Sequence, residues 1–186
     1  MGAAMTSPVA YGDERSLGIP AHDDDAFRSW YDATLPRVYR YLLARCGGDP
    51  ALAEELTQQT FVEALRNRRR FDGRADVVTW LVAIGRHKLI DHFRRAGRDR
   101  QRHLRLVSRW GYGEGGWDGA EERQAINAAL DQLSGEHRIA LLLRYLDGLS
   151  VREVARALGR SESATESLLV RAREAFRHAY GDPGHG

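Results

Sequence analysis

Apolar residues recur at helical spacing along most of the chain. In the stretch after Pro50, Ala53, Leu56, Thr60 and Ala64 lie on one side of a helix, while acidic and amide side chains fall on its other faces. Nowhere do apolar and polar residues alternate as they do in a half-buried strand bounded by turns. The pattern therefore predicts an all-α protein.

Glycine, proline and capping residues divide this pattern into separate helices. Gly47-Gly48 ends the first helix, and Asp49-Pro50 opens the second with an N-cap and a proline in its first turn. Phe71-Asp72-Gly73 makes a turn before the third helix. The expected helices cover 26–46, a stretch that begins at 50, 76–95, 121–132, 135–147, 151–158 and 162–180.

Two stretches without helical period define the domain organisation. Residues 1–25 mix small residues with acids, and six glycines are spread through 96–120. We expect two small helical domains joined by a flexible linker. The expected segments are a mobile tail at 1–25, a helical domain at 26–95, the linker at 96–120, a helical domain at 121–180 and a tail at 181–186.

Bulk composition excludes little. Lys and Arg (28) barely exceed Asp and Glu (26), so the net charge of +2 neither demands nor excludes nucleic acid. Cys46 is the sole cysteine, so an internal disulfide is impossible and a reducing cytoplasm is the expected location. We see no signal peptide and no apolar run near the roughly 20 residues that span a bilayer, so no membrane insertion is expected.

The stretch from Ser150 to Arg173 has the pattern of a helix-turn-helix. Ser150-Val151-Arg152-Glu153 is a capping box, Gly159 suits a left-handed helix end, and Ser161 or Ser163 can cap the next helix. In this motif the second helix enters the major groove of DNA. Arginines along it are available for phosphates, namely Arg171, Arg173 and Arg177. The alternative is a helical hairpin with a solvated charged face.

The most basic stretch lies between residues 86 and 105. Its eight Lys and Arg residues are opposed only by Asp91 and Asp99, so its local charge is +6. Such a stripe is typical of a surface that follows a phosphate backbone, although a solvated helix face is the alternative. Phe71, Trp80 and Phe93 lie nearby and suit stacking on unpaired bases, but a Trp at helical spacing is as often a core residue.

Signs of catalysis are weak. There is no glycine-rich phosphate loop and no nucleophile–base motif. His87, Asp91 and His92 could be read as metal ligands, because positions four apart share a helix face, but the sequence supplies no credible third and fourth ligand and the arginines repel a dication. We predict no cofactor, no metal site and no enzymatic activity.

Taken together, these stretches resemble the extracytoplasmic-function (ECF) sigma factors, the smallest branch of the sigma-70 family, over roughly residues 26–180. The run Asp49–Phe61 is similar to the acidic helix of region 2 that docks on the clamp helices of polymerase. Phe71-Asp72-Gly73-Arg74 with Thr79-Trp80-Leu81 resembles the melting segment, and Ile84–Arg95 resembles the helix that engages the minus-ten element. Residues 150–178 are similar to region 4, which reads the minus-thirty-five element.

The resemblance implies residue roles and partners. The partners are core RNA polymerase and promoter DNA; anti-sigma factors are common in the family, although no residue here identifies one. Core-polymerase binding falls to Glu54, Glu55, Gln58 and Gln59. Minus-ten recognition and melting fall to Trp80, Arg86, His87, Lys88, Arg94 and Arg95. Helix-turn-helix contacts fall to Ser163, Thr165, Glu166, Ser167, Arg171 and Arg173.

The chain departs from the family pattern at a few positions. His87 stands where Asn is usual, and Glu166 and Leu168 stand where Lys and Arg are common. An acid near phosphates should weaken the contact there. Two other classes of function stay open on sequence alone: a helix-turn-helix regulator that acts without polymerase, and a metal-dependent nuclease using His87, Asp91 and His92.

Overall fold

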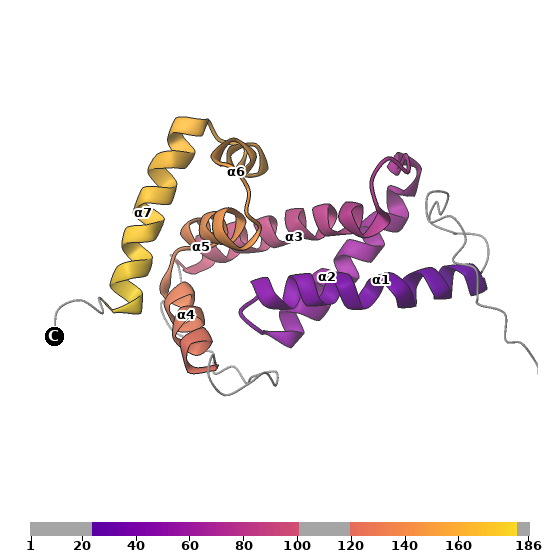
Figure 1. The fold of residues 1–186 in the computed structure, drawn as a ribbon, viewed down its shortest axis with the longest axis horizontal. Helices are drawn as coiled ribbons and strands as arrows, with labels where there is room; N and C mark the ends of the chain where they lie inside the picture. Colours follow the sequence, from indigo (N-terminus) through magenta and orange to yellow (C-terminus); the bar gives the residue numbers. More distant parts are fainter. Residues whose placement is uncertain (1–23, 101–119, 182–186) are drawn as a thin grey trace, which may run out of the picture.

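The computed structural model describes residues 24–100 and 120–181, and this part of the chain is helical with no strand (Figure 1). The all-α prediction is confirmed. The N-terminal module, residues 24–100, comprises α1 (Asp24–Arg45), α2 (Pro50–Arg66), the short 3₁₀ helix η2 (Arg68–Arg70) and α3 (Val77–Arg100). The C-terminal module, residues 120–181, comprises α4 (Ala120–Gln132), α5 (Gly135–Leu141), the π-helical turn η4 (Leu142–Leu146), α6 (Val151–Leu158) and α7 (Glu162–Tyr180).

The helix boundaries follow the capping signals. Gly47 and Gly48 take φ of 73° and 83° and end α1, and Asp49 accepts a hydrogen bond from the Leu52 backbone N–H at 3.0 Å to open α2. Helix α3 continues to Arg100, past the end expected at Arg95. The linker expected at 96–120 and the tail expected at 1–25 lie largely outside the described residues.

The three helices of the N-terminal module meet closely at Gly85. A Cβ built on this residue would lie 3.3 Å from Thr60 Oγ1 on α2 and 3.5 Å from Leu42 Cδ2 on α1. Gly85, Thr60 and Leu42 are all buried. The missing side chain therefore lets α3 approach α1 and α2 together, which fixes where the polar face of α3 points.

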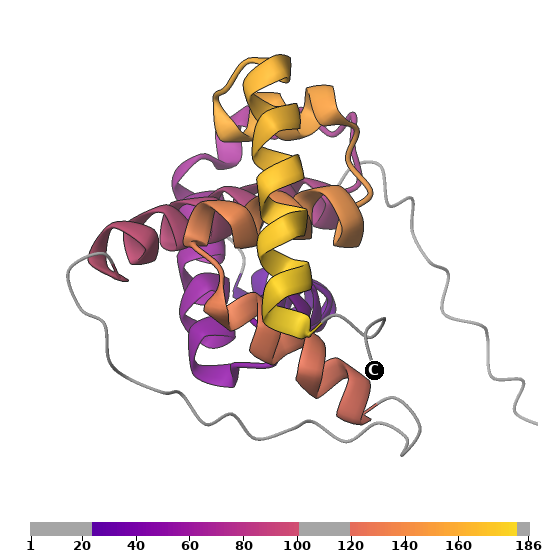
Figure 2. The ribbon, with the colours of Figure 1, turned by 90° about the vertical axis from the view of Figure 1, so that its left-hand side faces the viewer.

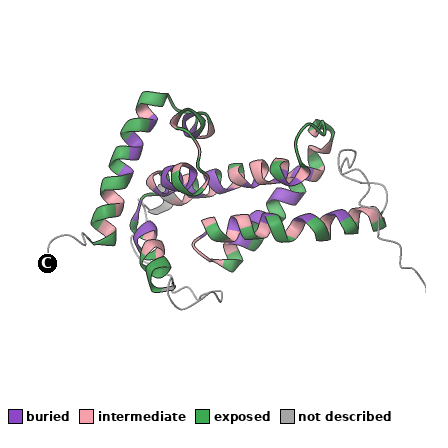
Figure 3. Cartoon of the chain, viewed as in Figure 1, coloured by how far each residue is buried: buried purple, intermediate pink, exposed green. Residues whose placement is uncertain are grey.

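The C-terminal module is built on α7, which packs against α4, α5 and α6. Buried residues lie along one side of α7, and its opposite side is exposed (Figure 3). The helix predicted over 135–147 is not a single α-helix, because its last turn widens into η4, where the Asp147 N–H bonds to the Leu142 carbonyl at 3.0 Å. This wider turn ends directly at Asp147.

The two modules pack against each other, which the sequence did not indicate. Helix α5 lies against α3, as the two views in Figures 1 and 2 both show. One continuous cluster of buried apolar residues runs through both modules, including Leu89 and Phe93 from α3 and Ile139 and Leu143 from the α5–η4 segment. The fold is therefore two helical modules closed on a common core.

Candidate nucleic-acid interface

The helix-turn-helix forms as the capping residues predict. Ser150 and Glu153 make a reciprocal capping box at the start of α6, and Gly159 ends that helix with φ of 58°. Of the two candidate caps for α7, Ser161 is the one used, since its hydroxyl accepts from the Ala164 N–H at 3.2 Å. Exposed Arg152 and Glu162 pair at 3.0 Å and join the two helices across the turn.

The exposed face of α7 carries most of the residues predicted to face DNA. Ser163, Ser167 and Arg171 recur every four residues on this face, with Glu166 beside them. Arg173 is also exposed. Val170, which was not among the predicted site residues, adds an exposed apolar position four residues after Glu166. A hydroxyl, an acid, a valine methyl and a guanidinium on one helix face provide donors, acceptors and an apolar contact for base edges.

Two positions on α7 require correction. Thr165 is fully buried and its hydroxyl donates to the Ser161 carbonyl at 2.9 Å, so this side chain does not face a DNA groove. Leu168 is also buried, so the departure from the family pattern at this position serves the core. Apolar periodicity could have signalled Leu168. The short side chain of Thr165 gave no such signal, because threonine is tolerated on either face.

The second polar surface lies on α2. Glu54, Glu55, Gln58 and Gln59 are all exposed on it, and Gln59 donates to Glu55 Oε1 at 2.9 Å. Val62, four positions after Gln58, is 47% exposed and continues this row. This row is therefore an exposed, mainly polar surface with one aliphatic side chain at its end. Val62 could not be predicted from the sequence, because an isolated exposed valine carries no signal.

The basic residues of α3 differ in their contacts. Lys88 pairs with Glu63 of α2 at 3.2 Å, and this hydrogen bond and charge lower the pKa of Glu63. Arg95 is exposed. Arg94 donates to the carbonyl oxygen of Leu158, at the end of α6 in the other module.

Trp80 and His87 differ in how far they are buried. Trp80 is half-buried and its ring lies 5.3 Å from that of Phe71, so the predicted stacking residue is itself supported by a second aromatic. His87 is exposed, and its Nδ1 lies 2.7 Å from the Ala83 carbonyl. Between Phe71 and α3, Asp72 and Arg74 form an exposed turn around Gly73, which has φ of 70°.

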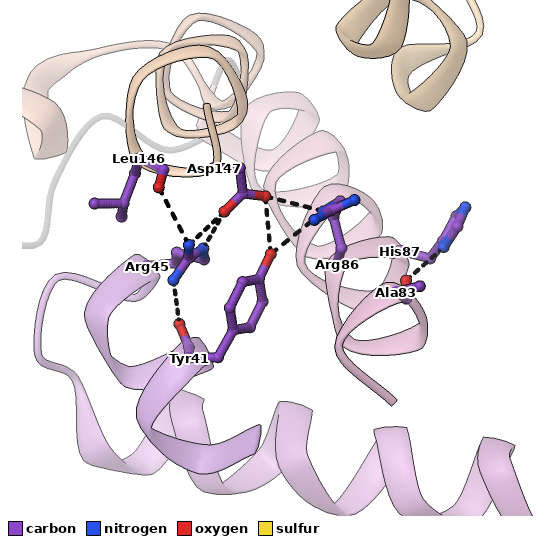
Figure 4. Close-up of polar contacts among 7 residues, drawn as sticks. All are labelled: Tyr41, Arg45, Ala83, Arg86, His87, Leu146 and Asp147. Atoms are coloured by element: carbon purple, nitrogen blue, oxygen red, sulfur yellow. Dashed lines mark hydrogen bonds and ion pairs between the residues drawn. The ribbon is translucent and has the colours of Figure 1, made fainter. Parts of the chain in front are cut away.

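Arg86 belongs to a buried polar cluster that joins the two modules (Figure 4). The Asp147 carboxylate is 2% exposed and accepts from Arg86 Nε at 2.9 Å, from Arg45 Nε at 2.6 Å and from the Tyr41 hydroxyl at 2.9 Å. The Arg45 guanidinium also lies over the Tyr41 ring, 3.6 Å from its centroid. Burial, and then the charge of Asp147, raise the pKa of Tyr41, so its hydroxyl stays a donor at neutral pH.

Arg138 forms a second contact between the modules. Its guanidinium is buried, pairs with Asp131 and lies 4.8 Å from the centroid of the Phe93 ring on α3. A Cβ on Gly47 would come within 3.0 Å of its Nη2. Nearby, the Asn127 amide donates to the Gly47 carbonyl at 3.3 Å.

Within residues 24–100 and 120–181, no group of three His, Cys, Asp or Glu side chains is arranged to hold a metal ion. His92, one of the three residues considered for a metal, is half-buried, and burial lowers its pKa. Burial raises the pKa of the Cys46 thiol to about 12, so this side chain is a packing element.

Among the described helices, none is both long enough and apolar enough to cross a bilayer.

Comparison with known families places both modules. Sigma-70 region 2 matches residues 30–99, and Sigma-70 region 4 matches residues 123–176. The chain is similar to the ECF RNA polymerase sigma factor SigX of Bacillus subtilis, with 30% identity over 170 residues that cover 83% of each protein. It is also similar to the ECF RNA polymerase sigma factor BldN of Streptomyces coelicolor, with 37% identity over 166 residues that cover 82% of this chain and 59% of BldN.

A solved structure has the same fold. The sigma factor RpoE from Bartonella quintana, in complex with the anti-sigma factor NepR, superposes with a TM-score of 0.54 at 24% identity, covering 82% of this chain and 95% of that one. The order of the two matched regions, their helical structure and the extent of the similarity agree. The chain belongs to the ECF branch of the sigma-70 family of RNA polymerase sigma factors.

Proposed function

We propose that this chain binds core RNA polymerase and directs it to promoters, where it recognises two DNA elements and stabilises melted DNA. The observation that supports this most is the presence of both sigma regions in order along one chain, each folded with an exposed polar face. A regulator acting through its helix-turn-helix alone would not need the matched region 2. The function requires neither covalent chemistry in this chain nor a cofactor. It does require a cytoplasmic location, where polymerase is found.

The α2 row is the proposed polymerase contact. A basic surface of the clamp helices would meet the four polar side chains of this row, Glu54, Glu55, Gln58 and Gln59. Exposed ion pairs contribute little binding free energy, so the apolar contact would come from Val62. Charge complementarity of this kind mainly sets partner choice and association rate.

The minus-ten role falls to α3. Trp80, supported by Phe71, would stack on an unpaired base, and His87, about two turns further along the same side of α3, would meet a base edge. Flipping a base out of the stack costs a few kcal/mol, which stacking and phosphate contacts offset. The phosphate contacts would come from Arg86, Lys88, Arg94 and Arg95. The upstream element would be read by Ser163, Glu166, Ser167 and Arg171, with Arg173 on the backbone.

The test is reconstituted transcription. Purified chain and core polymerase are incubated with fragmented genomic DNA, and the 5′ ends of the RNA are sequenced. We expect start sites preceded by a shared pair of sequence elements, absent without the chain. RNA starts that are the same with and without the chain would overturn the proposal.

The docking assignment has a sharper test. Glu54→Lys combined with Glu55→Lys should abolish core binding in a pull-down, because two reversed charges then face a surface that is complementary to the original acids. The matched control is Glu121→Lys with Glu122→Lys, an acidic pair on α4 that is also exposed. If the α2 reversal still binds core polymerase as well as the α4 reversal does, the docking surface lies elsewhere.

An anti-sigma factor is a further proposed partner, by analogy with a protein of the same fold. The sigma factor RpoE from Bartonella quintana forms a complex with the anti-sigma factor NepR. A pull-down from native cells, followed by mass spectrometry, tests the analogy. Recovery of polymerase subunits and no other stoichiometric protein would contradict it.

A further inference from the structure

Residues needed for promoter contact are occupied within the chain itself. Arg86 is bound to Asp147, Arg94 is bound to the Leu158 carbonyl, and both acceptors belong to the C-terminal module. His87 lines a cleft between α3 and α6 together with Arg86 and Arg156. The helix proposed for minus-ten recognition therefore faces the module proposed for upstream recognition.

Promoter geometry is incompatible with this arrangement. The positions that name the minus-ten and minus-thirty-five elements differ by about 25 base pairs, which at about 3.4 Å each is roughly 85 Å of duplex from one element to the other. Arg86 and Asp147, one from each module, lie 2.9 Å apart. The two modules cannot read both elements while they are in contact, so the closed arrangement must open before promoter binding.

Asp147 is the centre of the contact. Its carboxylate is nearly fully buried and accepts from three side chains of the N-terminal module, two of them arginines on different helices. Such charge-assisted hydrogen bonds are the strong ones, but burial of three charges carries a desolvation penalty that offsets much of the gain. The contact is therefore specific in geometry and modest in net energy, as a reversible closure requires.

The position of Asp147 depends on its local backbone. The π turn η4 ends at this residue, and Gly148 follows with φ of 69°. The Leu146 carbonyl beside it accepts from Arg45 Nη2 at 3.5 Å. Side chain and backbone thus meet the N-terminal module at the same place (Figure 4).

We propose, building on the promoter-recognition function above, that Asp147 is a latch that holds the free sigma factor in a self-blocked closed state. The latch binds Arg45, Arg86 and Tyr41, and its release frees Arg86 and Arg94 for DNA. Polymerase opens the chain to the extent that it binds the open state better than the closed one.

Opening is measured as a distance in the full chain. Cysteines replace Ala33 on α1 and Glu174 on α7, both exposed, and carry spin labels for pulsed EPR. The native Cys46, which is 5% exposed in the closed arrangement, is replaced by Ser in every protein compared, so that only the two introduced thiols carry labels. Asp147→Asn and Arg45→Gln break the latch from opposite modules, and neither residue is assigned to DNA or polymerase. The control is Glu136→Gln, which removes a surface ion pair with Arg160 inside the C-terminal module.

We expect one short distance in the unaltered chain and in Glu136→Gln, and a longer, broader population in both latch variants. The closed-to-open ratio should fall at least about tenfold, which corresponds to about 1.4 kcal/mol. Distances that stay short in both latch variants overturn the proposal, and the circular dichroism of each variant shows whether the helices are intact.

A second readout measures self-blocking. A fluorescent single-stranded oligonucleotide at low salt should bind Asp147→Asn several-fold more tightly than the unaltered chain, because two arginines are released. Equal binding, despite an open distance distribution, overturns self-blocking. A failure of the proposed function itself would give a different result. Asp147→Asn would still show the longer distance between the two labels, but it would give no transcription with core polymerase.

Discussion

Gly85 allows a prediction in which two opposing effects can be weighed. Replacing it by Ala in mid-helix should stabilise α3 by about 1 kcal/mol, since glycine is a poor helix former. The new methyl would lie 3.3 Å from Thr60 Oγ1, tighter than an ordinary van der Waals contact, and 3.5 and 3.6 Å from the two Leu42 methyl carbons. The sign of the outcome therefore depends on whether Thr60 can move.

Thr60 is held in place. It is fully buried, and its hydroxyl donates to the Leu56 carbonyl at 2.7 Å, so retreat of Oγ1 strains that hydrogen bond or moves α2. Overpacking of a filled core costs about 1–3 kcal/mol. The overpacking cost exceeds the propensity gain, and we expect Gly85→Ala to lower the free energy of unfolding by about 1 kcal/mol.

The assay is urea denaturation of the full chain followed by circular dichroism. The control is a double-mutant cycle with Thr60→Ala, which removes the crowded oxygen. Against that background Gly85→Ala should cost little or even stabilise, giving a coupling of about 1 kcal/mol. The reasoning would be refuted if Gly85→Ala raised the free energy of unfolding of the unaltered chain. It would also be refuted if Gly85→Ala lowered that free energy equally with and without Thr60→Ala.

Two further predictions concern a cap and an ion pair. Ser161→Ala should destabilise the chain by about 1 kcal/mol, because it removes the cap of α7. The control, Ser163→Ala, should leave the thermal unfolding midpoint almost unchanged. Equal shifts of the midpoint in the two variants would contradict the cap assignment. Lys88 lowers the pKa of Glu63 in the folded state below its ordinary value of 4.5, so their pairing contributes stability that is complete above that pH and is lost as the pH falls through the folded-state pKa. Glu63→Gln should therefore flatten the acid limb of a stability-against-pH curve measured by urea denaturation, and an unchanged slope there would contradict the pairing.

The closed arrangement links the proposed polymerase contact to the proposed DNA contact. The α2 row is exposed while Arg86 and Arg94 are occupied, so polymerase can meet its surface before the chain opens. A sigma factor with this order of events would bind free DNA weakly and promoters only after joining polymerase. Measuring oligonucleotide binding with and without core polymerase distinguishes this order from independent binding.

The sequence alone determined the local structure and much of the exposed surface. Capping residues and glycines located the helix starts, because these signals act through backbone hydrogen bonds within a few residues. Ser150-Val151-Arg152-Glu153 with Gly159 predicted the helix-turn-helix, and the structure has it at those residues. The acidic row of α2 followed from helical spacing alone, since polar residues opposite an apolar stripe face outward.

Only the tertiary structure decided which residues are available. Thr165 and Ser163 look alike in sequence, yet one is buried and one exposed, because the packing of α7 against three helices sets the boundary of its buried face. Asp147 carried no signal, since its partners Tyr41, Arg45 and Arg86 lie 106, 102 and 61 residues away. Periodicity describes one helix at a time, whereas a buried carboxylate gathering donors from two other helices is a property of how the modules close.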